Sequence, residues 1–204
     1  MDAIGDFVVG MVGSRLVEWA AIVLLLINVT LIIRRSVWNY PFGLAGVALY
    51  CWIFYDYKLY SDSLLQAYYF GIQIFGWVWW VRNRGADGLV HVARLDPRTI
   101  PLIALGAVAG AFALGWVMGT YTDAALPYWD ATTTVLSVIA QFLLARRFLE
   151  SWLVWIVVDV LSIGIYVTKG LTPTAALYGV FLVLATIGLT TWWRAWRSGE
   201  ALPA

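Results

Sequence analysis

The sequence predicts an all-α membrane protein with seven transmembrane helices. Of its 204 residues, 62% are hydrophobic and only 12% are charged, whereas a soluble domain carries about 25% charged residues. Apolar runs of about 18 residues or more, which is enough to cross a bilayer, recur along nearly the whole chain. Since these runs leave too little sequence for a sizeable soluble domain, we expect a single transmembrane domain over residues 1–204.

Seven helices are expected, and the loops between most of them are short. Prolines 41, 101 and 173 stand near helix starts, where a missing N–H does least harm. The longest polar stretch, RNRGADGLVHVARLDPRT, separates the third helix from the fourth. The expected ranges are 16–34, 40–57, 62–81, 100–120, 130–148, 151–168 and 172–193.

The basic residues predict the orientation of the chain. One side of the membrane would hold ten arginines, whereas the other would hold only Arg15, Lys58 and Lys169. Loops rich in Lys and Arg stay in the cytoplasm. The N-terminus is therefore expected outside and the C-terminus inside. The ten are Arg34, Arg35, Arg82, Arg84, Arg94, Arg98, Arg146, Arg147, Arg194 and Arg197.

The chain also matches itself after a shift of 112 positions, which carries Glu18 onto Asp130. The same shift superimposes the arginine pairs 34–35 and 146–147, Leu59 and Leu171, and two G-x3-W motifs that end at Trp80 and Trp192. The first repeat would cover about 16–81 and the second about 130–193. A single linking helix at about 100–120 would restore the orientation after three crossings, which gives a 3+1+3 plan with parallel repeats. Similar helices that match only by composition are the alternative.

The linking helix contains four glycines in two G-x3-G spacings, at Gly106, Gly110, Gly115 and Gly119. Small residues at this spacing let two helices approach closely. We expect them to serve packing, within the chain or between chains.

Few polar side chains lie at membrane depth, and most of them follow helical faces. Asp159 interrupts the apolar run LVWIVVDVLSIGIY, and a carboxylate at that depth costs a few kcal/mol. The row on the same face is Trp155, Asp159, Ser162 and Tyr166; other rows are Gln66, Tyr69, Gln73 and Trp77, and Thr134, Ser137 and Gln141. Asn28, Tyr50 and Tyr178 are further deep polar groups.

These groups fit a site for a flat, polar small molecule, whether neutral or cationic. Amide groups can bind hydroxyls or a carboxamide, aromatic faces can stack on a ring, and Asp159 could offset a positive charge. Two structural alternatives remain at this point. Asn28, Thr134 and Ser137 could simply bond to a neighbouring helix, and Asp159 could be protonated or tie two helices together.

Several classes of protein are disfavoured. One cysteine, Cys51, and one histidine, His91, cannot build the usual haem, zinc or iron–sulfur sites, so neither metal nor cofactor is expected. The net charge of +1 gives no sign of nucleic-acid binding. The seventh helix has no lysine for a retinal Schiff base. A membrane enzyme would need an acidic or histidine cluster, and a purely structural membrane protein would leave the deep glutamines unexplained.

The chain resembles the PnuC family of vitamin-precursor transporters over about residues 18–196. Three segments carry the resemblance, namely WNYPFG, KLYSDSLLQAYYFGIQIFGWVWW and LSVIAQFLLARRFLESWLVWIVVDVLSIGIYVTKGLTPTAALYGVFLVLATIGLTTWW. The resemblance implies a fold like that of the SWEET transporters, nicotinamide riboside as substrate, facilitated diffusion and a homotrimer. Some relatives carry thiamine or riboflavin instead. The implied binding residues are Gln66, Tyr69, Gln73, Trp77, Gln141, Trp155, Asp159 and Tyr178.

The sequence also bears on how transport is driven. It contains no G-x4-G-K-[ST] loop for nucleotide phosphates, and a single deep carboxylate is little for a proton relay. Facilitated diffusion through the inner membrane is therefore expected. Net uptake would then depend on a separate cytoplasmic kinase, which phosphorylates the vitamin precursor and so feeds NAD biosynthesis.

Overall fold

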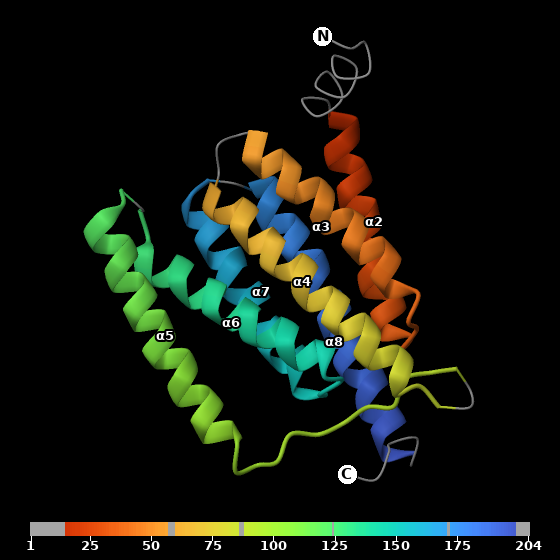
Figure 1. The fold of residues 1–204 in the computed structure, drawn as a ribbon. Helices are drawn as coiled ribbons and strands as arrows, with labels where there is room; N and C mark the ends of the chain where they lie inside the picture. Colours follow the sequence, from red (N-terminus) through yellow and green to blue (C-terminus); the bar gives the residue numbers. More distant parts are fainter. Residues whose placement is uncertain (1–14, 57–59, 86–87, 124, 171, 199–204) are drawn as a thin grey trace. The chain divides into compact units, whose positions relative to one another are not determined.

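The computed structural model describes residues 15–56, 60–85, 88–123, 125–170 and 172–198. These residues form seven α-helices and two isolated β-bridges, which confirms the all-α prediction (Figure 1). The helices are α2 (Arg15–Ile33), α3 (Asn39–Asp56), α4 (Tyr60–Arg82), α5 (Ile100–Tyr121), α6 (Pro127–Ala145), α7 (Glu150–Thr168) and α8 (Thr172–Arg197).

The helices have the character of membrane spans. Ile100–Tyr121, Glu150–Thr168 and Thr174–Arg197 are each long and apolar enough to cross a bilayer, and Val17–Ile33 is a shorter apolar helix. Helix α5 exposes 66–71% of the surface of each residue in a row of large apolar side chains. Such a surface is stable next to lipid rather than water. The row consists of Leu102, Leu105, Val108 and Phe112.

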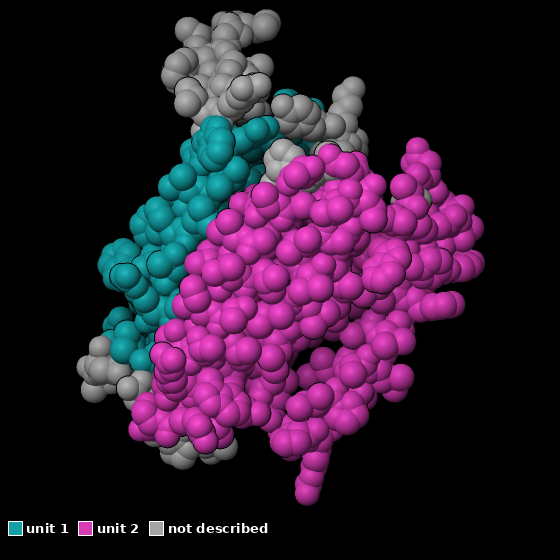
Figure 2. All heavy atoms as spheres, turned by 180° about the vertical axis from the view of Figure 1, so that it is seen from behind, with its two compact units in different colours: residues 1–90 teal, residues 91–204 magenta. Residues whose placement is uncertain are grey.

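The chain divides into two compact units, residues 1–90 and residues 91–204 (Figure 2). In the first unit α2 packs on α3, and α3 packs on α4. In the second unit each helix from α5 to α8 packs on the next one along the chain. Helices that are consecutive in sequence are therefore neighbours in space within each unit.

Helices α6 to α8 repeat the lengths and spacing of α2 to α4. Residue for residue, α6 covers the positions of α2 shifted by 112. Helix α7 begins one position earlier than a shifted α3 and ends at the same position, and α8 begins where a shifted α4 would begin. The match between Leu59 and Leu171 lies outside the described residues. The two helix triplets therefore share one local plan.

The corner after the first helix of each triplet is the same in detail. Arg35 and Arg147, which correspond, are the two non-glycine residues with positive φ, at 58° and 69° in the described chain. Each ends a helix in a Schellman motif, in which the next residue's N–H bonds back five positions. Ser36 N donates to Leu31 O over 3.0 Å. The equivalent bond in the second triplet also spans 3.0 Å, from residue 148 to residue 143.

An aromatic contact explains the repeated G-x3-W motif. Tyr40 of α3 meets Trp80 of α4 edge-on, with ring centroids 5.4 Å apart and planes at 88°. The equivalent rings, Trp152 of α7 and Trp192 of α8, are 5.5 Å apart at 86°. The glycine of the second motif, Gly188, lies against the Trp152 indole, where a Cβ would come within 2.6 Å of ring carbons. The glycine makes room for one ring, and the tryptophan presents its edge or face to that ring.

Three of the four glycines of α5 pack against α6. A Cβ at Gly110 would touch Val135, and one at Gly119 would touch Pro127. At Gly115 it would come within 2.5 Å of the Tyr128 ring, whereas nothing lies within 4 Å of a Cβ at Gly106. Close packing inside the chain, which was one of the two expected roles, therefore applies to three of these glycines.

The segment between α4 and α5 donates hydrogen bonds to the backbone carbonyl groups of both corner arginines. Val90 N donates to Arg35 O in the first unit, and Ala93 N donates to Arg147 O in the second. Arg94 then pairs with Glu150 at the start of α7. The Arg94 guanidinium also lies 4.8 Å from the ring centroid of Trp196, within the range of a cation–π contact.

The prediction for one helix was displaced by three residues. The expected range 130–148 is observed as Pro127–Ala145. The helix begins earlier because Pro127 occupies its first turn, where a fixed φ and a missing N–H are favourable. It ends earlier because Arg147 adopts a left-handed conformation. Helix α8 runs four residues beyond the expected end at 193.

Candidate functional site

The eight residues predicted to bind a ligand all lie on described helices. Four of them, Gln66, Tyr69, Gln73 and Trp77, lie on α4 in the first unit. The other four lie in the second unit: Gln141 on α6, Trp155 and Asp159 on α7, and Tyr178 on α8. Each unit therefore supplies half of the predicted set.

Asp159 stands at the centre of α7, with nine helical residues on either side. Its residue surface is only 3% exposed, and Ser162 on the same face is equally buried. Within the part of the chain that the structure describes, its carboxyl group makes neither a hydrogen bond nor an ion pair. A buried carboxylate without such a partner is strongly disfavoured, so Asp159 is either protonated or paired with a cation from outside the described chain.

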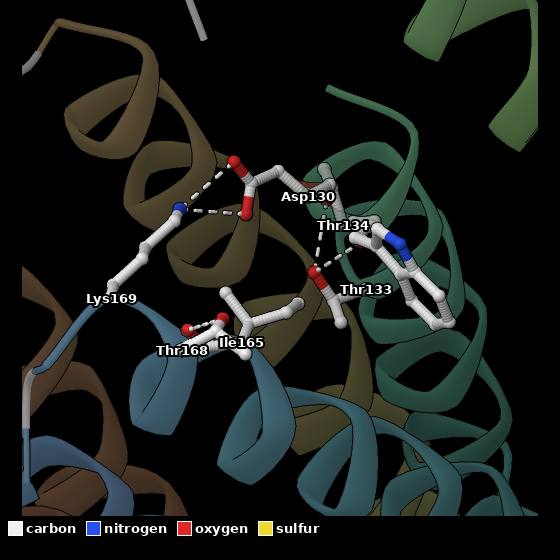
Figure 3. A network of polar contacts seen from close by, with 7 residues as sticks. Asp130, Thr133, Thr134, Ile165, Thr168 and Lys169 are labelled. Atoms are coloured by element: carbon white, nitrogen blue, oxygen red, sulfur yellow. Dashed lines mark hydrogen bonds and ion pairs between the residues drawn. The ribbon is translucent and has the colours of Figure 1, made fainter. Parts of the chain in front are cut away.

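Other acidic side chains of the second unit do have partners. Both carboxylate oxygens of Asp130 accept bonds of 3.1 Å from Lys169 Nζ, where α6 begins and α7 ends (Figure 3). Glu150 accepts from Arg94 Nε and, over 3.0 Å, from Leu95 N. These carboxylates lie at helix ends, whereas Asp159 lies in the middle of a helix.

In the first unit, the amide of Gln73 lies in a buried polar cluster. The residue is 5% exposed, and its Oε1 has no hydrogen-bond partner among the described residues. Asn28 Nδ2 of α2 donates to Asn39 O, at the start of α3, over 2.9 Å. A Cβ added at Gly43 would overlap both Gln73 Oε1 and Asn28 Nδ2. Three helices therefore bring their polar groups together at this glycine.

The predicted aromatic residues make ring contacts within their own units. Trp77 lies parallel to Tyr40, with centroids 6.2 Å apart and planes inclined by 6°. Tyr178 of α8 stacks on Tyr166 of α7 at 5.2 Å and 27°. Helix α7 thus carries an aromatic residue one turn before Asp159 and another two turns after it, at Trp155 and Tyr166.

Some deep polar groups have a purely local role. Thr134 Oγ1 donates to Asp130 O over 2.8 Å, which satisfies the hydroxyl within its own helix (Figure 3). Gln66 and Gln141 are half-buried, and no hydrogen bond to either side chain is present in the described chain. The expected bond to a neighbouring helix is therefore not the one that Thr134 makes, whereas Asn28 does make such a bond, to Asn39 O of α3.

Sequence reasoning missed Asn39, Tyr40 and Gly43 as contributors to this region. All three belong to the WNYPFG segment at the start of α3. The sequence did contain a signal, because Asn39 and Gly43 are four residues apart and so share one face of a helix. In the structure they lie next to Asn28 and Gln73, two of the predicted polar residues. Their partners lie on other helices, however, and only the folded chain identifies them. Among the described residues, no group of three or more His, Cys, Asp or Glu could hold a metal ion.

Comparison with known proteins identifies relatives along most of the chain. The family model described as "Nicotinamide mononucleotide transporter" matches residues 15–194. The nicotinamide riboside transporter PnuC of Escherichia coli is 28% identical, over 76% of this chain and 75% of that protein. The riboflavin/roseoflavin transporter RibM of Streptomyces davaonensis is 27% identical, over 82% and 80% of the two chains.

A solved structure agrees with these matches. The crystal structure of the vitamin B3 transporter PnuC superimposes with a TM-score of 0.73 and 26% sequence identity. The match covers 94% of this chain and 86% of that one. The chain therefore belongs to the nicotinamide mononucleotide transporter family, the membrane transporters of the PnuC type that its motifs resemble.

Proposed function

We propose that this protein imports nicotinamide riboside across the cytoplasmic membrane by facilitated diffusion. The observation that carries the proposal is Asp159, a buried carboxyl group at mid-helix for which the described chain offers no partner. The pyridinium ring of nicotinamide riboside is flat and positively charged. It could offset the carboxylate and stack on neighbouring aromatic rings such as Trp155. Relatives named as nicotinamide riboside transporters support the same substrate.

The charge distribution favours the riboside over the mononucleotide in the family's description. A phosphate group is bound in proteins by Arg, Lys or helix N-termini. The twelve Arg and Lys residues that the structure describes lie at helix ends or in loops. In the described helices, the one residue of a charged type at mid-helix is the acidic Asp159, whose carboxylate would repel a phosphate. The uncharged carboxamide and the ribose of the ligand, in contrast, suit the glutamine and asparagine amides.

Two other vitamins are alternatives. Thiamine is also flat and cationic, so Asp159 does not separate it from nicotinamide riboside. Riboflavin is uncharged and larger, which suits the carboxylate less well, but the relative RibM carries that vitamin in its name. Both belong in the same binding experiment.

The transport cycle follows from the repeat. We propose that the two helix triplets rock to expose the ligand alternately to each side, that the N-terminus lies outside, and that the protein is a homotrimer. Phosphorylation by a separate cytoplasmic kinase would trap the imported riboside as an anion. No step would consume a nucleotide on this chain.

Calorimetry on the purified protein tests the substrate. Nicotinamide riboside, nicotinamide mononucleotide, thiamine and riboflavin are titrated into the wild-type protein in detergent, and the riboside should bind tightest. Replacing the carboxylate by Asp159→Asn should weaken riboside binding at least about tenfold, because the isosteric amide lacks the charge. Riboflavin binding should change less, since riboflavin carries no positive charge.

A carboxylate that already has a partner provides the control. Asp130→Asn removes an ion pair with Lys169 that is partly exposed, and it should leave riboside affinity within about twofold. Unchanged affinity in Asp159→Asn would remove that residue from the site. Tighter binding of the mononucleotide than of the riboside would reject the proposed substrate.

A further inference from the structure

We infer that Asn28 and Gly43 are positioning residues, which hold the Gln73 amide so that its N–H donates to the carboxamide oxygen of the ligand. The inference rests on the proposed function and adds an orientation for the substrate. In it, Gln73 of the first helix triplet recognises the carboxamide group. It concerns residues that do not touch the ligand themselves.

Gly43 fixes where the two amides can lie. An added Cβ would come within 2.5 Å of Asn28 Nδ2, and closer still to Gln73 Oε1. Real Cβ atoms do not approach polar atoms so closely, so any other residue at 43 would displace at least one amide. The absence of a side chain at this position therefore lets α4 bring Gln73 against α2 and α3.

Asn28 and the amide oxygen of Gln73 share the space beside Gly43. Asn28 Nδ2 donates to Asn39 O over 2.9 Å and to Asn39 Oδ1 over 3.4 Å. Gln73 Oε1 lies beside the same glycine and makes no hydrogen bond in the described chain, so this end of the amide faces the contact between α2 and α3. The remaining polar group of Gln73 is its Nε2, a donor without a partner in the described chain. Nε2 is therefore the end of the amide that can donate to a ligand.

The second triplet shows that the fold does not need this cluster. The positions that correspond to Asn28, Asn39 and Gln73 after the shift of 112 are Ala140, Ser151 and Ala185, and all three are buried. The position of Gly43 is taken by Trp155. The helix starts agree to within one residue, and the corner and the edge-on aromatic contact are nevertheless closely similar in both triplets. A buried amide cluster that one copy has and the other lacks is therefore explained better by a ligand than by folding.

The selectivity between two ligands measures the effect. Nicotinamide riboside is compared by calorimetry with N-ribosylpyridinium, which has the same charge and ribose but no carboxamide. The wild-type protein should prefer the riboside at least about tenfold, because a donor left unpaired by the analogue is penalised. In Gly43→Ala this preference should fall to about twofold or less, through loss of riboside affinity alone.

A second glycine of the same unit serves as the control. Nothing lies within 4 Å of a Cβ at Gly71 on α4, so Gly71→Ala should keep the wild-type preference. In a Gln73→Ala background, Gly43→Ala should cause no further loss of riboside affinity, since the displaced amide is already absent. Asn28→Ala tests the same coupling by removing the neighbouring amide rather than by adding a methyl group. This variant replaces Gly43→Ala in the experiment if Gly43→Ala does not fold.

Two results in the variants would overturn the inference. One is an equal loss of affinity for both ligands in Gly43→Ala or Asn28→Ala, which would indicate a general effect on structure. The other is an additive loss in the Gln73→Ala background. A wild-type protein that binds the riboside and its analogue equally well would also contradict the carboxamide contact, while leaving the proposed transport function intact. A wild-type protein that binds no riboside would instead reject the proposed function.

Discussion

Arg35 and Arg147 adopt a backbone conformation that glycine normally occupies. For a residue with a side chain, the left-handed region costs about 1–2 kcal/mol, and helices commonly end with glycine at this point. Burial, and then the neighbouring charge of Arg146, lower the pKa of Arg147 from its ordinary value. The chain nevertheless places an arginine at both corners. Other contacts of the side chains therefore offset the strain; one is the bond from Arg147 Nη1 to His91 O.

A comparison of two substitutions isolates the backbone cost. Arg35→Gly and Arg35→Ala both remove the side chain, but only glycine adopts φ of 58° without strain. The glycine variant should therefore be more stable than the alanine variant by about 1 kcal/mol. For a chain of this size that corresponds to a melting temperature about 2–4 °C higher, as measured by tryptophan fluorescence in detergent.

The neighbouring arginine provides the control. Arg34 is not among the residues with positive φ, so Arg34→Ala should be at least as stable as Arg34→Gly. Equal stability of the Arg35→Gly and Arg35→Ala variants would show that residue 35 does not adopt a left-handed conformation.

At the scale of helices, the contact between α7 and α8 depends on a glycine beneath a tryptophan. The Trp152 indole lies so close to Gly188 that a Cβ would come within 2.6–2.7 Å of three ring carbons. Trp152 and Trp192 are also among the most buried residues of the chain. Since the indole is rigid and enclosed, it cannot move aside without disturbing its neighbours.

Gly188→Ala should therefore destabilise the protein by about 1–3 kcal/mol through overpacking, although alanine is the better helix former. The measurement is the midpoint of thermal unfolding in detergent. Gly179→Ala on the same helix, where nothing lies within 4 Å of the added Cβ, should be neutral or slightly stabilising. Equal stability of the two variants would show that Trp152 does not pack on Gly188.

At the scale of the whole molecule, the chain joins two helix triplets of the same local plan that differ in their polar groups. The first triplet carries the amide cluster of Asn28 and Gln73, and the second carries Asp159 and Trp155. Each triplet therefore offers a different chemistry to a ligand: the first offers amide groups, and the second offers a carboxyl group and an aromatic ring.

Reconstitution into liposomes tests the mode of transport. Vesicles that contain only this protein should take up labelled nicotinamide riboside until the inside and outside concentrations are equal. An imposed proton gradient should not change that final level, because the chain has one carboxylate at mid-helix and no nucleotide-binding loop. Adding a riboside kinase and ATP inside the vesicles should raise the total label by trapping the phosphorylated product. Accumulation driven by the proton gradient alone would contradict facilitated diffusion.

The sequence by itself determined the membrane class, the seven helices and the repeat spacing, because these depend on local hydrophobicity and helix length. It also singled out Asp159 and Gln73, since polar groups are rare at membrane depth. Only the tertiary structure decided which of these groups have partners. Thr134 bonds to its own helix, Gln73 lies against Asn28, and Asp159 has no described partner. The start of α6 at Pro127 and the role of Gly43 were equally hidden, because packing between helices depends on residues far apart in the sequence.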